Sequence, residues 1–144
     1  MKLIKRLKEN FFGFLFGRQK VKQILVKEEV LEDIISFAKM NHPNEFVAFL
    51  GGEVKNNTLM ITHLLYQNYY ASSKSVMTKI NFPMLSNVVG SVHSHPGPSN
   101  QPSDDDLLFF GKTGMVHFII KYPYNYEDIA AYNYRGDPIT YDIY

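Results

Sequence analysis

The segment from Val88 to Asp106 constrains the fold of this chain more than any other part of the sequence. An apolar run, Val88–His95, ends in two histidines separated by one residue, and a loop with three prolines connects it to Ser103. Ser103 followed by three aspartates is a typical helix start, because serine caps the first backbone N–H groups and acidic side chains favour the positive end of the helix dipole. The sequence therefore predicts a strand, a restricted loop and a helix in succession.

The two histidines, His93 and His95, can present both imidazole rings to one ion, because alternate residues of a strand point to the same face. The chain has no cysteine, so a metal must be held by histidine and carboxylate groups. Catalytic zinc takes three protein ligands and leaves one position for water. Asp104, Asp105 and Asp106 compete for the third ligand position, and a helix that starts after Ser103 favours Asp106 in its first turn.

Two further residues suit hydrolysis at such a site. Glu45 is the acidic residue beside the apolar run 46–50, and we expect it at a buried edge near the metal, where it would serve as general base. Ser103 can direct its hydroxyl at a developing oxyanion and stabilise a tetrahedral intermediate. Alone, Glu45 is equally compatible with a surface position and Ser103 with a helix cap. The combination is more specific than either residue.

The rest of the sequence predicts one α/β domain. A chain of 144 residues with 45% hydrophobic residues can bury a core of its own. Apolar spacing predicts a helix over residues 27–40, and residues 55–58 predict a hairpin turn. We expect strands at residues 46–50, 59–66, 76–81, 88–95, 115–121, 129–133 and 139–144, and a short helical turn at residues 82–87. Helices alternating with strands indicate a mixed sheet flanked by helices. His42, His63 and His117 are interpreted as structural.

The N-terminal segment, residues 1–22, is basic and amphipathic, and residues 23–144 form the expected catalytic domain. Six lysines and arginines against one glutamate give residues 1–20 a net charge of +5, which leaves −4 for the other 124 residues. The net-acidic remainder argues against nucleic acid as a partner. The segment is compatible with a membrane surface or a partner's groove, or with packing on its own domain or on a second copy in a homodimer. We expect a cytoplasmic protein, with peripheral contact to the membrane as the alternative.

Glu45, the sequence His93-Ser-His-Pro, the seven residues 96–102 and the sequence Ser103-Asp-Asp-Asp together resemble the signature of the JAMM (MPN+) metalloproteases. Every signature position is filled at the family's spacing, and the resemblance covers residues 27–144. The chain is especially similar to short single-domain archaeal and bacterial members. The resemblance implies a cytidine-deaminase-like (JAB1/MPN) α/β fold with a mixed sheet flanked by helices.

The resemblance also implies one zinc ion per chain, bound by His93, His95 and Asp106. In the family the glutamate, here Glu45, acts as general base and then acid on the water at the fourth position. The serine, here Ser103, helps to stabilise the tetrahedral oxyanion.

The activity implied by the resemblance is that of a zinc-dependent isopeptidase or peptidase. Family members cleave bonds after the C-terminal glycines of ubiquitin or ubiquitin-like proteins, which usually bind as an added strand. Between residues 110 and 144 there is no room for the second ubiquitin-gripping insertion, which favours a small ubiquitin-like modifier or its conjugates. Alternatives are a zinc endopeptidase for sulfur-carrier precursors or cell-wall peptides, and a non-catalytic MPN scaffold.

Overall fold

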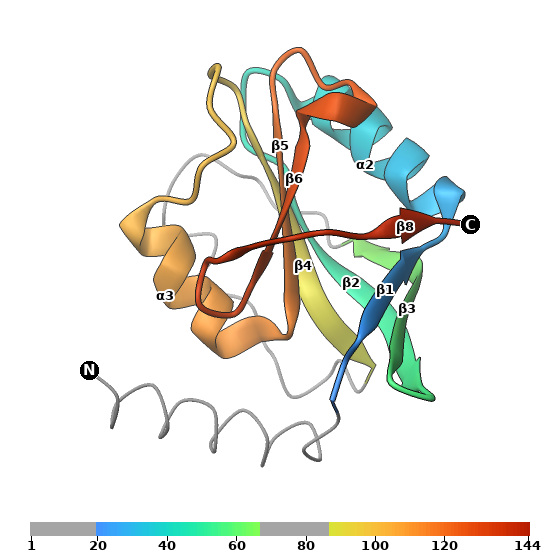
Figure 1. Cartoon of the computed structure of the whole chain (residues 1–144). Helices are drawn as coiled ribbons and strands as arrows, with labels where there is room; N and C mark the ends of the chain where they lie inside the picture. Colours follow the sequence, from blue (N-terminus) through green and yellow to red (C-terminus); the bar gives the residue numbers. More distant parts are fainter. Residues whose placement is uncertain (1–19, 67–86) are drawn as a thin grey trace.

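The computed structural model describes residues 20–66 and 87–144 (Figure 1). Residues 1–19, the strand expected at residues 76–81 and nearly all of the turn expected at residues 82–87 lie outside the described residues. Within residues 20–66 and 87–144, no helix has the length and apolar character that crossing a membrane requires.

The described residues form a mixed sheet of eight strands in the order β7-β6-β5-β4-β2-β3-β1-β8. The strands are β1 (Gln23–Val26), β2 (Val47–Lys55), β3 (Thr58–Tyr66), β4 (Val88–His95), β5 (Val116–Lys121), β6 (Ile129–Asn133), β7 (Pro138–Ile139) and β8 (Asp142–Ile143). The pairs β1–β3, β1–β8 and β4–β5 are parallel, and the other neighbouring pairs are antiparallel. The helices are α2 (Glu28–Asn41), α3 (Asp104–Thr113) and the short 3-10 helix η2 (Tyr126–Asp128).

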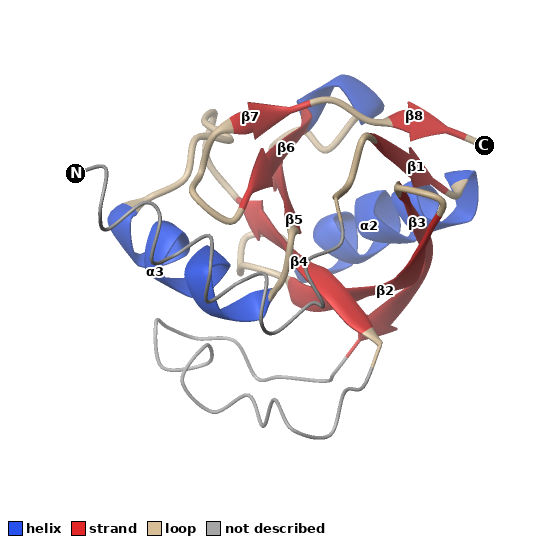
Figure 2. Ribbon diagram, turned by 60° about the horizontal axis from the view of Figure 1, so that its bottom comes forward, coloured by secondary structure: helices blue, strands red, loops and turns tan. Residues whose placement is uncertain are grey.

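The sheet is curled, as the connection between its last two strands requires. β7 and β8 lie at opposite ends of the strand order, yet only two residues, 140 and 141, separate them in the chain. A short connection can join both edges only if the edges approach each other, and Figure 2 shows β7 and β8 on the same side of the molecule. The predicted α/β fold with a mixed sheet flanked by helices is confirmed.

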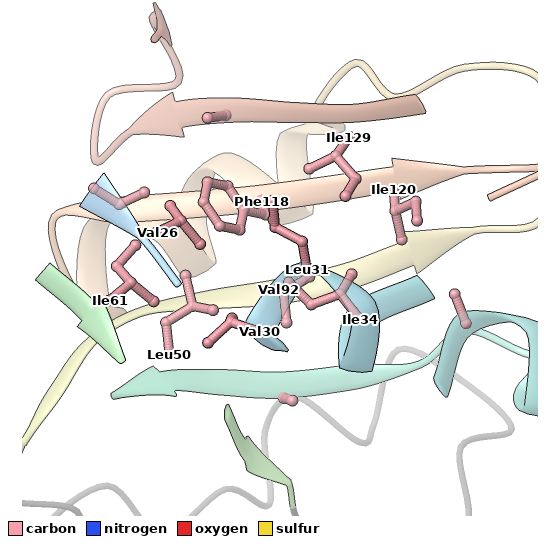
Figure 3. Close-up of a cluster of buried hydrophobic side chains, with 14 of the residues drawn as sticks. Val26, Val30, Leu31, Ile34, Leu50, Ile61, Val92, Phe118, Ile120 and Ile129 are labelled. Carbon is pink, nitrogen blue, oxygen red and sulfur yellow. The ribbon is translucent and has the colours of Figure 1, made fainter. Parts of the chain in front are cut away.

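Each face of the sheet has its own apolar cluster, because successive strand residues point to opposite faces. The face toward α2 carries the larger cluster (Figure 3), which includes Leu31, Ile34, Leu50, Val92 and Phe118. The face toward α3 carries a smaller cluster of six buried residues: Val47, Phe49, Phe109, Phe110, Ile119 and Tyr132. The two clusters fix α2 and α3 on opposite faces of the same central strands.

Most elements lie where the sequence predicts them, with corrections at both ends of the chain and in β2, which continues to Lys55 instead of ending at residue 50. β1 was not predicted, because four residues beside the basic segment are too short to show a period. The single strand expected at residues 139–144 is wrong: the chain forms β7 and β8, which pair with different edges. The hairpin at residues 55–58 is confirmed, and the positive φ angles of Asn56 (53°) and Asn57 (61°) suit the turns that join twisted antiparallel strands.

Gly90 in β4 is required by the close approach of β5. A Cβ atom at Gly90 would lie 1.6 Å from the carbonyl oxygen of Val116, a backbone atom held in the β4–β5 pairing. We expect Gly90→Ala to lower the free energy of unfolding by about 3 kcal/mol or more in urea denaturation, because the overlap forces the backbone to shift. The control is Gly111→Ala in α3, where the new Cβ meets nothing within 4 Å and alanine should stabilise the helix by about 0.5–1 kcal/mol. Equal effects of the two substitutions would contradict this.

Candidate metal centre

Three segments meet at the edge of the sheet where β4 ends. β4 and β5 are parallel neighbours, so the chain needs a crossover between them, and α3 is that crossover. The helix therefore starts beside the end of β4. β2 runs antiparallel to β4, with Val47 paired to His93, so the beginning of β2 lies at the same edge. The topology thus brings together residues that are far apart in the sequence.

The side chains of His93, His95 and Asp106 converge at this edge. The two imidazole Nε2 atoms are 3.0 Å apart. The Nε2 atom of His93 lies 3.1 Å from Oδ1 of Asp106, and that of His95 lies 3.3 Å from Oδ2. His93 and Asp106 are buried, while His95 is partly exposed. Two imidazole nitrogens and one carboxylate therefore point to one small volume. Solvent reaches this volume from the side of His95.

Asp106 is held in place by the first turn of α3. Its backbone N–H donates to Oγ of Ser103 at 3.2 Å, and its carboxylate Oδ2 accepts from the Ser103 backbone N–H at 2.8 Å. This reciprocal capping box orients the carboxylate toward the histidines. Burial alone would raise the pKa of Asp106, but hydrogen bonds from the His93 and His95 side chains lower it well below its usual range. The carboxylate is therefore ionised throughout the physiological range.

The three residues fit a divalent cation. One ligand atom from each lies within 4.8 Å of the others, and the set has the nitrogen and oxygen donors that three-ligand catalytic zinc sites use. Among the residues that the structure describes, the buried Nδ1 atom of His93 has no hydrogen-bond partner, so the polar contacts of this ring are those of its Nε2 atom. For His95, burial lowers the pKa, but hydrogen bonds to Asp106 and to the Ser99 backbone, with the charges of Asp106 and Glu45, raise it overall. These negative charges would equally attract a metal cation.

Glu45 is exposed, which corrects the expectation of a buried edge. The next residue, Phe46, takes the buried position instead and stacks on Phe37 of α2. Glu45 is nevertheless close enough for its charge to raise the pKa of His95. Ser94, between the two histidines, holds the segment: its Oγ accepts from Phe46 N–H at 2.7 Å, and its N–H donates to the Phe46 carbonyl at 2.9 Å. The backbone beside Glu45 is therefore fixed to the strand that carries both imidazoles.

The sequence offered no signal for the roles of two loop residues, Ser99 and Asn100. The carbonyl of Ser99 accepts from Nδ1 of His95 at 2.9 Å. Asn100 forms hydrogen bonds with Tyr132 in β6 and with Asp128 at the end of η2. The Ser99 contact and one Asn100 contact use backbone carbonyl groups, which any residue type provides, and the Asn100 side-chain amide meets a partner 28 residues away in the chain. Only the folded structure can therefore identify them.

The other three histidines have partners outside this site, in agreement with their interpretation as structural. His42 bonds the Tyr124 hydroxyl at 2.8 Å, and His63 contacts Thr62 and Asn87. His117 is fully buried beneath the triad, where its ring stacks on Phe110.

His117 makes the protein sensitive to acid. Its Nδ1 lies 2.7 Å from the Ser91 hydroxyl and its Nε2 lies 2.9 Å from the Gly114 carbonyl oxygen, so the neutral ring is satisfied on both sides. Burial lowers the pKa of His117 from 6.5 to about 3, helped by the nearby His93 and opposed by the bond to Gly114. Below pH 6.5 the unfolded chain therefore binds a proton at this histidine that the folded protein excludes, and stability falls as the pH falls.

We expect the His117 contribution to reduce the free energy of unfolding by about 2–3 kcal/mol between pH 6.5 and pH 4.5. Urea denaturation of the metal-free protein at a series of pH values would measure it. The variant His117→Gln keeps a polar side chain without a titrating ring, so its stability should change less over this interval. Parallel pH profiles for both proteins would refute the assignment.

Comparisons with known proteins place the chain in a family. Residues 27–133 match the family model of prokaryotic homologs of the JAB domain. A protein from Haloferax volcanii described as a probable metalloprotease is 30% identical over 130 residues, which cover 82% of this chain and 78% of that protein.

Solved structures of similar fold lead to the same family. A JAB1/MPN domain protein from Archaeoglobus fulgidus is 30% identical, with a TM-score of 0.66, over 82% of this chain and 96% of that one. A structure described as JAMM, a metalloprotease-like zinc site in the proteasome and signalosome, is 29% identical, with a TM-score of 0.65, over 85% of this chain and 99% of that one. A Desulfitobacterium hafniense protein at 17% identity shares the fold, with a TM-score of 0.64 over 85% of this chain and 93% of that one. From the family match and this fold it follows that the chain belongs to the JAMM/MPN family, among the prokaryotic homologues of the JAB domain.

Proposed function

We propose that this protein is a zinc-dependent peptidase that hydrolyses isopeptide or peptide bonds after the C-terminal glycines of ubiquitin-like modifier proteins. The observation that carries the proposal is the convergence of two imidazole Nε2 atoms and the Asp106 carboxylate at one solvent-accessible edge of the sheet. The metalloprotease description of the Haloferax relative and the zinc site of the JAMM structure support it.

In this proposal His93, His95 and Asp106 hold one zinc ion. When bound, zinc polarises a carbonyl group and lowers the pKa of a water molecule to about 7. The Nδ1 atom of His95 donates to the Ser99 carbonyl, so Nε2 is the nitrogen that would bind a cation. The Asp106 carboxylate is ionised, and its Ser103 contact restricts its rotation. A bound cation would take the place of the protons through which the two histidines bond Asp106.

Glu45 is the proposed general base. It is exposed, it lies two residues before β2, and its charge reaches His95, so its carboxylate is near the triad and accessible to solvent. It would take the proton from the attacking water and then deliver it to the leaving amine. The Ser94–Phe46 bonds keep its backbone in fixed relation to β4.

Ser103 is the proposed oxyanion donor. As the cap of α3, its Oγ accepts a hydrogen bond from the Asp106 N–H, which uses a lone pair of the oxygen. The hydroxyl proton is not needed for capping and remains available to donate to a developing oxyanion. Capping and transition-state stabilisation are therefore compatible in one residue.

The test is incubation of the purified full-length protein with isopeptide conjugates of a glycine-ended ubiquitin-like protein. Cleavage that stops with a chelator and returns with added zinc is the expected result. A parallel series with linear sulfur-carrier precursors and with cell-wall peptides separates the endopeptidase alternative. If none of these substrates is cleaved by zinc-loaded protein, the proposal fails in favour of a non-catalytic scaffold.

A further inference from the structure

The loop that joins β4 to α3 is anchored at one residue, Asn100, to the strand and turn on its far side. The hydroxyl of Tyr132, in β6, donates to the Asn100 backbone carbonyl at 2.7 Å. The side-chain amide of Asn100 donates to the Asp128 backbone carbonyl at 3.0 Å. The loop is therefore tied down by both its backbone and its side chain at this position.

The anchored residue follows the one that contacts His95. The carbonyl oxygen of Ser99 lies 2.9 Å from Nδ1 of His95. A carbonyl only accepts, so Nδ1 carries a proton, and Nε2, which faces His93 and Asp106, is the nitrogen available to a cation. This contact is exposed, and water competes for the Nδ1 proton unless the Ser99 carbonyl is held in position.

Tyr132 is a rigid support for this loop. Its side chain is buried in the α3-side cluster, where the ring stacks on Phe110 at a centroid distance of 6.2 Å. The same Phe110 ring stacks on His117 and lies 6.3 Å from the ring of His93. The Tyr132 ring therefore packs on Phe110, which also contacts His93, and its hydroxyl bonds the loop that contacts His95.

We infer that Tyr132 is a positioning residue for the metal centre, which acts through Asn100 and Ser99 to fix the tautomer and the orientation of His95. The inference rests on the proposed function, in which His95 binds zinc. Outer partners of a ligating histidine raise its basicity and fix its ring, and their loss typically weakens metal binding about 10- to 100-fold. Tyr132 does not contact His95 directly, so we expect its loss to weaken zinc binding by the lower end of this range.

The variant Tyr132→Phe removes only the hydroxyl and keeps the ring in its stack. We expect its zinc dissociation constant, measured by competition with a chromogenic chelator, to rise about tenfold relative to the unmodified protein. The matched control is Tyr124→Phe: Tyr124 is equally buried, at 2% exposure like Tyr132, and its hydroxyl bonds His42 rather than the loop. The control should bind zinc as the unmodified protein does.

A second readout distinguishes positioning from a general loss of stability. In a histidine-selective ¹H–¹⁵N spectrum of the zinc-loaded protein, the His95 Nδ1 proton should exchange slowly with solvent, and it should exchange faster in Tyr132→Phe. Asn100→Ala, which releases the other anchor, should change both quantities in the same direction. Its effect should be less than additive with Tyr132→Phe if both act through the loop.

The outcomes distinguish the zinc site from the positioning role of Tyr132. If the unmodified protein binds no zinc, the proposed function fails. If it binds zinc and both Tyr132→Phe and Asn100→Ala leave the dissociation constant and the exchange rate unchanged, the positioning role is refuted while the zinc site stands. An equal loss in Tyr124→Phe also refutes it, since the effect would then be general.

Discussion

His93→Ala is expected to lose zinc and activity together. The imidazole of His93 is buried, at 1% exposure, and its Nε2 atom lies within 3.1 Å of both other members of the triad. Alanine leaves two ligands, whereas catalytic zinc needs three from the protein. Elemental analysis of the dialysed variant should find zinc far below one ion per chain, and conjugate cleavage should fall to the level of the chelated enzyme.

The control for this substitution is His117→Gln, which alters another buried histidine on the same face of the sheet but outside the triad. It should retain zinc at near-native stoichiometry. Circular dichroism of both variants would show whether the fold persists. Full zinc occupancy in a folded His93→Ala protein would remove His93 from the ligand set.

Glu45→Gln should retain zinc and lose turnover. The glutamine is isosteric but cannot accept a proton from water, and general acid–base catalysis typically contributes about 10²–10⁴ in rate. Because Glu45 is exposed and is not one of the three converging residues, neither stability nor zinc content should change greatly. Measurement of kcat together with zinc content separates loss of the base from loss of the metal.

Glu53→Gln provides the matched control, since Glu53 is an exposed glutamate in β2, the strand that Glu45 precedes. Its kcat should stay within about twofold of the native value, as expected for a surface substitution away from the site. A Glu45→Gln enzyme with native kcat would exclude Glu45 as the base and require another proton acceptor.

The sequence predicts the central part of the fold well because local rules and tertiary structure agree there. β4 has the predicted bounds, and Ser103 caps α3 as serine before aspartates should. Alternation in β4 places His93 and His95 on one face, and the first helical turn brings Asp106 to them. Their roles as ligands, and those of Glu45 and Ser103, stay predictions that the variants above test.

The parts that the sequence did not predict depend on contacts between distant segments. β1 is a short strand between β3 and β8, and β8 is a two-residue edge strand that reaches β1 because the sheet curls. Glu45 was expected to be buried because it adjoins an apolar run, but the chain buries Phe46 and leaves the carboxylate exposed. Neighbouring hydrophobic residues indicate a nearby core and do not decide on which side of it a polar residue lies.

The central place of β4 in the sheet has a consequence for how the protein handles its ion. β4 is paired to β5 from Gly90 to His95 and to β2 as far as His93, so the backbone that carries both histidines belongs to the packed centre of the sheet, which resists local opening. The receptacle is thus built before any cation arrives, unlike small zinc domains that fold only on loading. We therefore expect that a chelator can remove zinc and that added zinc can restore it without a refolding step.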